Sequence, residues 1–101
     1  MKIQERLVQT IQAGKWAALE DLDKVLAPIE TRHGFPPKRR FQCVSGVYPA
    51  GVLVIERDWD SLAAAEAGWV SVMNDQEYIK ATSDFGSVVA SMTREFFMSL
   101  D

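Results

Sequence analysis

Residues 52–73, VLVIERDWDSLAAAEAGWVSVM, place a strand pattern directly before a helix pattern. The β-branched run at 52–55 is typical of a strand, and either Asp60 or Ser61 suits the N-cap of a helix. In that helix the apolar side chains recur every three or four residues and form one stripe, made of Leu62, Ala65, Trp69, Val72 and Met73. This stretch therefore predicts one strand followed by one helix.

The same order of patterns occurs at the start of the chain. Residues 2–11 alternate with a period of two, which predicts a strand. Residues 15–33 carry apolar side chains at helical spacing, and Gly34, followed by two prolines, predicts the end of that helix. Each half of the chain thus begins with a strand and continues into a helix.

Two more strands complete the predicted fold. Residues 41–48 alternate and are joined by turn residues 49–51 to the strand beginning at 52, and residues 88–98 alternate as a last strand. The order βαββαβ predicts a single α+β domain over residues 1–101 with a ferredoxin-like arrangement. Its sheet has four antiparallel strands, with the first and third in the centre and the helices on one face.

Composition limits the classes of partner. The chain has 14 acidic and 11 basic residues and a net charge of −3, so we expect no nucleic-acid partner, and the basic triplet 38–40 is interpreted as a solvated strand entrance. The strand-like start, the single Cys43 and the lack of an apolar run long enough for a bilayer predict a soluble cytoplasmic protein with no membrane partner. One His and one Cys exclude a zinc site built from such ligands, and we predict no metal.

The whole chain resembles the dimeric α/β-barrel superfamily, near its NIPSNAP and antibiotic-biosynthesis-monooxygenase-like (ABM-like) branches. The stretches that carry this resemblance are residues 59–66, WDSLAAAE, and residues 73–78, MNDQEY. The resemblance implies a homodimer whose sheets meet as a barrel, with any ligand cavity between a sheet and its own helices. It implies no single activity, since the superfamily contains cofactor-free monooxygenases, haem-degrading enzymes, isomerases and members without a known role.

Three charged residues interrupt apolar strand faces and are candidates for the cavity: Glu5, Arg57 and Arg94. Buried charges need partners, so Glu5 is expected to pair with Arg94, while Arg57 is expected to lie closer to Gln9. In a mostly apolar cavity an arginine can hold the carboxylate or enolate of a small substrate. The alternative is a structural ion pair.

His33 is the candidate general base, because it is the only side chain that ordinarily titrates near neutral pH. Its alternative role is to satisfy late carbonyl groups at the end of the first helix. The other candidate ligand-binding residues are aromatic, namely Trp16, Trp69 and Tyr78. Tryptophans at such positions are also ordinary core residues.

The predicted function is a homodimeric small-molecule-binding protein, with cofactor-independent monooxygenase or isomerase activity on a small aromatic or polyketide-like substrate as its catalytic version. No cofactor is predicted. The alternatives are a non-catalytic structural or ligand-binding dimer and an RNA-binding module, since the same topology carries base-stacking aromatics in RNA-binding proteins. The acidic charge and the lack of the RNA-binding signature argue against that last alternative.

Dimerisation through the sheet is expected from the strand sequences. Leu53 and Ile55 alternate with Val54, and Phe96 with Phe97, so both sheet faces are predicted to be substantially apolar. An apolar face of that size is rare on a monomer, and a second copy of the chain is its simplest cover.

Overall fold

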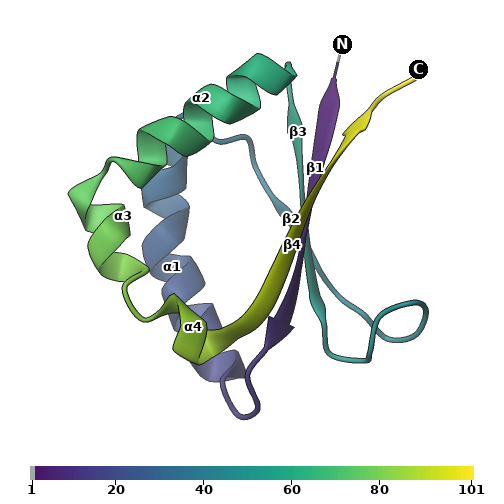
Figure 1. The fold of residues 1–101 in the computed structure, drawn as a ribbon, viewed down its shortest axis with the longest axis vertical. Coiled ribbons are helices and arrows are strands. Elements are labelled where there is room, and N and C mark those ends of the chain that lie inside the picture. The colour runs from purple at the N-terminus through teal and green to yellow at the C-terminus, as the bar shows by residue number, and fades with distance from the viewer. Residues whose placement is uncertain (1) are drawn as a thin grey trace.

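The computed structural model describes residues 2–101 and confirms the ferredoxin-like α+β fold (Figure 1). Four antiparallel strands form one sheet in the order β2-β3-β1-β4, so the first and third strands are central, as predicted. The elements are β1 (Ile3–Ile11), α1 (Trp16–Arg32), β2 (Arg39–Gln42), β3 (Leu53–Trp59), α2 (Leu62–Met73), α3 (Gln76–Ala81), α4 (Phe85–Val88) and β4 (Val89–Met98).

All four helices lie on one face of the sheet, which Figure 1 shows nearly edge-on. The side chains of Ile3, Glu5 and Leu7 point to this helix-covered face, because alternate residues of a strand share a face and Ile3 and Leu7 pack in the core with helix residues. Intervening residues such as Arg6 and Val8 belong to the opposite face, here called the open face. None of the elements formed by residues 2–101 covers the open face (Figure 1).

The core consists of two apolar clusters between the sheet and the helices. The first contains Ile3, Ile29, Phe35, Trp59, Ala65 and Val72. The second contains Leu7, Leu19, Leu53, Ile55, Val88 and Val89. Trp69 packs against both, so this one side chain links the clusters.

The helix ends follow local capping rules. Ser61, one of the two predicted caps, accepts a hydrogen bond from the Ala64 N–H at 3.0 Å and begins α2. Gly34 ends α1 with φ of 80°, which glycine adopts without a steric penalty. The cap of α3 is Asp75, which accepts from the Glu77 N–H at 2.8 Å.

The β2–β3 connection differs from the predicted hairpin. The strand predicted at 41–48 ends at Gln42, and residues 43–52 form a loop that projects from the sheet (Figure 1). Backbone hydrogen bonds from Cys43 to Val52 and from Gly51 to Cys43 close its base. Val47, at the far part of the loop, is 96% exposed, so its apolar side chain contacts little of the chain.

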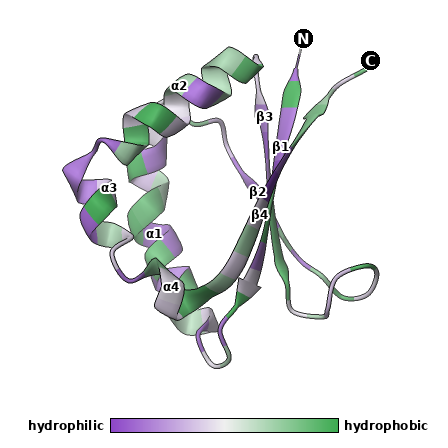
Figure 2. Cartoon of the chain, viewed as in Figure 1, coloured by the Kyte–Doolittle hydropathy of each residue, from purple (hydrophilic) through white to green (hydrophobic). Residues whose placement is uncertain are grey.

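The open face is less apolar than predicted. Val54 and Phe97 do lie on it, as expected, and so does the half-exposed Phe41. Charged residues separate these apolar side chains, namely Arg6, Arg39, Glu56, Asp58 and Glu95. Strand alternation therefore gives the open face a mixture of apolar and charged side chains. Figure 2 shows hydrophilic and hydrophobic residues interspersed along the strands.

None of the helices formed by residues 2–101 combines the length and the apolar composition needed to cross a bilayer.

Candidate functional site

A cavity of about 350 Å³ lies between the sheet and the helices, and we call it the central cavity. Apolar side chains from the sheet and from α1 line much of it, among them Leu7, Leu19, Leu53 and Ile55. Its volume falls at the lower end of the range of sites for small organic ligands.

Four of the predicted ligand-binding residues meet at this cavity. Arg57 on β3, Trp69 on α2, Tyr78 on α3 and Arg94 on β4 all line it. Trp16 is not part of the lining and packs instead beside the second core cluster. His33 is also outside the lining, because it follows the last turn of α1 at the edge of the helix layer.

Glu5 is the acidic centre of the polar groups beside the cavity. Its side chain is only 1% exposed and accepts hydrogen bonds from the indole N–H groups of Trp69, at 2.5 Å, and Trp59, at 3.5 Å. Each of its oxygens also lies 3.5 Å from an arginine nitrogen, one from Arg57 and the other from Arg94. The predicted Glu5–Arg94 pair is therefore present, and a second arginine shares the carboxylate.

Arg57 lies directly opposite Glu5 in the β1–β3 register, so the expectation that it lies closer to Gln9 is wrong. Antiparallel pairing brings Gln9 opposite Leu53 instead. The Arg57 side chain is 2% exposed, and its Nη2 donates to the Glu30 carboxylate at 2.9 Å. Its Nε and Nη1 make no hydrogen bond with any of residues 2–101.

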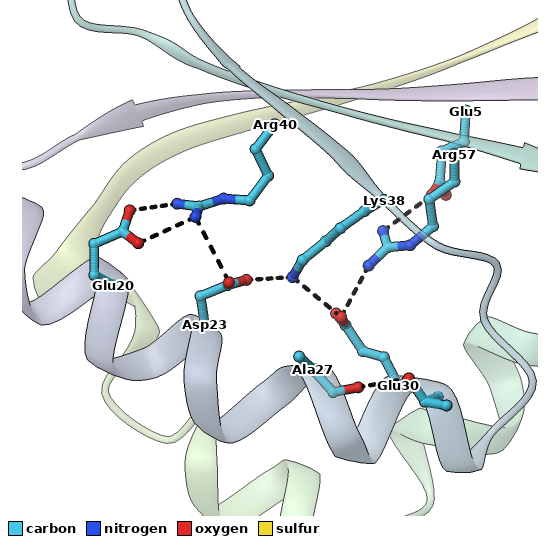
Figure 3. Close-up of polar contacts among 9 residues, drawn as sticks. Glu5, Glu20, Asp23, Ala27, Glu30, Lys38, Arg40 and Arg57 are labelled. Atoms are coloured by element: carbon cyan, nitrogen blue, oxygen red, sulfur yellow. Dashed lines mark hydrogen bonds and ion pairs between the residues drawn. The ribbon is translucent and has the colours of Figure 1, made fainter.

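The ion pairs continue from Arg57 to the surface as an alternating chain (Figure 3). The members in order are Glu5, Arg57, Glu30, Lys38, Asp23, Arg40 and Glu20. The Arg40–Glu20 contact is 2.5 Å long, and this hydrogen bond lowers the pKa of the Glu20 carboxyl. This row of ion pairs joins α1 to the segment that leads into β2.

This arrangement corrects the interpretation of the basic triplet. Lys38 is 14% exposed and lies between two carboxylates of α1, so it is not a solvated residue. Arg39 alternates to the open face, where it pairs with Asp58. A signal was present in the sequence: Glu20, Asp23 and Glu30 lie at spacings of three and seven, which places the three acids on one helix face.

Arg94 is the most exposed of the lysines and arginines in the described lining of the central cavity. Its guanidinium lies over the Trp69 ring, 4.1 Å from the centroid, and its side chain is 35% exposed. Apart from the 3.5 Å ion pair with Glu5, it makes no hydrogen bond to residues 2–101. Most of its five N–H donors are therefore available to a ligand.

Tyr78 contributes a neutral hydroxyl to the same lining. Burial raises the pKa of its phenol, and the neighbouring Glu30 carboxylate raises this pKa further, against the opposite effect of Arg94 and Arg57. The phenol is therefore protonated at neutral pH and can donate a hydrogen bond.

A second polar group lies outside the cavity, where the end of α1 meets α2 and α3. His33 Nδ1 lies 2.6 Å from Ser71 Oγ, and His33 Nε2 lies 2.6 Å from Asp75 Oδ2. Arg32 donates to the same Asp75 oxygen at 2.7 Å. Hydrogen bonds from His33 and then from Arg32 hold the pKa of the Asp75 carboxyl far below its ordinary value.

Comparison with known proteins relates this geometry to solved structures. No protein-family model and no curated protein sequence matches the chain. A NIPSNAP family protein from Agrobacterium tumefaciens aligns over 100% of this chain and 95% of its own, with a TM-score of 0.86 and 15% identity. An uncharacterised NIPSNAP domain protein from Burkholderia xenovorans aligns over 98% and 94%, with a TM-score of 0.81 and 17% identity.

A third similar structure is that of an oxygenase. It is a mutant of SnoaB, a cofactor-independent oxygenase from Streptomyces nogalater, which aligns over 99% of this chain and 94% of its own, with a TM-score of 0.68 and 11% identity. The fold and the cavity thus define a ferredoxin-like α+β protein with a cavity between sheet and helices. Its fold is that of the NIPSNAP and ABM-like proteins, as the resemblance of residues 59–66 and 73–78 indicated.

Proposed function

We propose that this protein binds a small anionic molecule with an aromatic or extended apolar body in the central cavity. The observation that carries the proposal is the Arg94 guanidinium, which lies over Trp69 at the cavity with unused hydrogen-bond donors. A guanidinium pairs with a carboxylate or a similar planar anion through two parallel hydrogen bonds.

The surroundings of Arg94 support an anion over a cation or a neutral polar ligand. Tyr78, protonated at neutral pH, adds a hydrogen-bond donor to the lining. The carboxylates that line the cavity, Asp23 and Glu30, are both occupied by Lys38 and by other basic partners. The site therefore offers free donors and few free acceptors, and apolar side chains can cover the rest of a ligand.

The catalytic version of this proposal is cofactor-independent oxygenation or isomerisation. In such a reaction a carbon acid or phenol passes a proton to water, and Arg94 and Tyr78 stabilise the resulting enolate or phenolate. The anion then reacts with O2 in an oxygenation, or takes a proton from water at another carbon in an isomerisation. The activity named for SnoaB makes this chemistry compatible with the fold, while its 11% identity supports a shared fold alone. His33 lies outside the cavity lining, so the proposed anion binding does not depend on it.

We also propose that the protein is a homodimer joined through the open face. Val54, Phe41 and Phe97 supply apolar area on that face. Its arginines and carboxylates are of both signs, which allows a two-fold symmetric pairing of unlike charges. This arrangement leaves the central cavity, on the other face of the sheet, free for a ligand.

Calorimetric titration with 2-naphthoate and its uncharged analogue 2-naphthamide tests the anion site. We expect the acid to bind at least about tenfold more tightly than the amide, since hydrogen bonds to charged groups contribute roughly 1.5–3 kcal/mol. Arg94→Gln should abolish this difference. Arg39→Gln, which changes an arginine on the open face, should preserve it.

Equal binding of acid and amide, or an Arg94→Gln protein that still prefers the acid, contradicts the proposed anion site. The catalytic version has a separate measurement: oxygen consumption and product mass with a phenolic or polyketide-like aromatic substrate. Binding without turnover across such substrates supports the ligand-binding protein and rejects the enzyme.

A further inference from the structure

The polar group outside the cavity has the connectivity of an activated nucleophile. Ser71, on the last turns of α2, is hydrogen-bonded to His33, and His33 is hydrogen-bonded through its other ring nitrogen to Asp75. Both distances are 2.6 Å. A hydroxyl, an imidazole and a carboxylate connected in this order are the parts of a base-assisted serine.

The Asp75 carboxylate determines which ring nitrogen of His33 carries the proton. Asp75 stays ionised near neutral pH, because hydrogen bonds from His33 and Arg32 lower its pKa. An ionised carboxylate can only accept hydrogen bonds, so in the neutral form of His33 the proton is on Nε2 and the Nε2–H group donates a hydrogen bond to Asp75. The lone pair of Nδ1 then faces Ser71 and accepts a hydrogen bond from its hydroxyl group.

Exposure within the group follows the same order. The side chains of His33 and Asp75 are only 17% and 15% exposed, whereas Ser71 is an exposed residue. The base and its carboxylate are thus largely shielded from water, and Ser71 is the exposed residue of the three.

The adjacent surface has room for an acyl group. A concavity of about 610 Å³ is lined by His33 and Gly34 together with Ala67 and Gly68 of α2. Ser71 follows those two residues by four and three positions, so it lies on the same face of the helix as they do. Ser71 is not itself part of the lining, and it adjoins the concavity through its contact with the lining residue His33.

We propose that Ser71 is a nucleophile that His33 activates and that it accepts an acyl group from an activated ester. Ser71 Oγ forms a bond to the ester carbonyl carbon while its proton passes to His33 Nδ1. The carbon–oxygen or carbon–sulfur bond of the ester then breaks, and the leaving group takes that proton. The products are acyl-Ser71, a free phenol or thiol, and His33 in its starting form.

The rate acceleration that a general base can supply limits the class of substrate. A positioned general base accelerates such a step by about 10²–10⁴-fold. An acceleration of that size acts on esters with good leaving groups, such as aryl esters and thioesters, and is too small for amides. We therefore assign activated esters and thioesters as the substrates of Ser71.

Acetylation by p-nitrophenyl acetate, located by peptide mass mapping, tests the proposal. The full chain should be acetylated at Ser71 in preference to Ser45, an exposed serine of the loop at 43–52 that has no histidine partner. Ser71→Ala should lose this label. His33→Gln should lower the rate of Ser71 acetylation at least about 100-fold.

Asp75 acts through His33, so it is a positioning residue and needs its own variants. Asp75→Asn keeps the cap of α3, because asparagine also caps helices, but loses the charge and should slow labelling. Asp75→Glu restores the charge and should recover part of the rate, which a purely structural role of Asp75 does not predict. Thermal unfolding identifies which variants are folded.

A folded wild-type protein without preferential acetylation of Ser71 overturns the proposal. Equal acetylation of Ser71 in the wild type and in a folded His33→Gln variant overturns the role of the base. The anion site of the central cavity is measured by a different experiment, so the two inferences succeed or fail separately.

Discussion

The Arg94 guanidinium carbon lies 4.1 Å from the centroid of the Trp69 ring, and the indole N–H of the same Trp69 donates to Glu5, the acid that pairs with Arg94. The tryptophan thus contacts the arginine through its π face and the carboxylate through its edge. This contact fixes the orientation of Arg94 without using its hydrogen-bond donors, which is the condition for an arginine that binds an anion.

Arg57→Met is expected to reduce the free energy of unfolding by about 3–5 kcal/mol. The substitution leaves the buried Glu5 and Glu30 carboxylates without their shared cation. Urea unfolding measures the loss. The control is Lys2→Met, whose exposed ion pair with Asp60 should contribute less than about 1 kcal/mol. Similar losses of unfolding free energy in the two variants would contradict the structural importance of the buried Arg57 ion pairs.

Gly68→Ala is expected to destabilise the protein by about 1–3 kcal/mol although alanine favours helices. A Cβ atom at Gly68 would lie 2.7 Å from Cη2 of Trp59, a side chain that is 2% exposed and has no room to move. Thermal unfolding checks the effect. Gly86→Ala is the control, because nothing lies within 4 Å of its added Cβ. It should leave the stability unchanged or raise it.

Asp75→Asn is expected to make folding stability depend less steeply on pH in the acid range. The folded-state pKa of Asp75 is below its ordinary value of 3.8, so the unfolded chain binds a proton that the folded chain does not. The stabilisation from ionised Asp75 is therefore complete above about pH 4 and declines as the pH falls toward the folded-state pKa.

Unfolding midpoints measured from about pH 5 to pH 2 check this sign. The wild-type midpoint should fall more steeply than that of Asp75→Asn across this interval. Asp101→Asn is the control and should follow the wild type, because the Asp101 carboxylate makes no ion pair with residues 2–101. Parallel curves for wild type and Asp75→Asn would contradict the prediction.

Phe97→Asp is expected to convert the proposed dimer into a monomer. Phe97 lies on the open face and is 41% exposed in one chain, and an interface through this face should bury on the order of 2,000 Å². Sedimentation equilibrium should give about twice the 11.3 kDa of one chain for the wild type. Val25→Asp, on the helix layer, should remain dimeric. A wild-type mass near one chain rejects the dimer.

The element order was available from the sequence because it depends on local periodicity. The alternation of residues 2–11 and the helical spacing after Ser61 correspond to β1 and α2. Central positions for the first and third strands followed from general rules of chain connection. The hairpin boundary was wrong because the loop at 43–52 depends on backbone bonds across its base rather than on side-chain period.

The candidate site was only partly predictable, because its contacts join residues that are distant in the sequence. Sequence alone identified Arg57, Trp69, Tyr78 and Arg94 as residues whose chemistry suits a cavity, and Glu5 as a charge that needs a partner. Strand register then determined that Glu5 faces Arg57, since a shift of one residue would move either side chain to the opposite face.

Only tertiary packing decided which charges of distant segments meet. Packing places Lys38 between two acids of α1 and places His33 outside the cavity lining. It also brings His33 into hydrogen-bonding contact with Ser71 and Asp75. Local propensity acts over a few neighbouring residues, whereas an ion pair or a hydrogen bond across 38 positions forms only when the sheet and helices have been packed together. The sequence by itself therefore determined the elements, and the packing of those elements decided the chemistry of the surfaces between them.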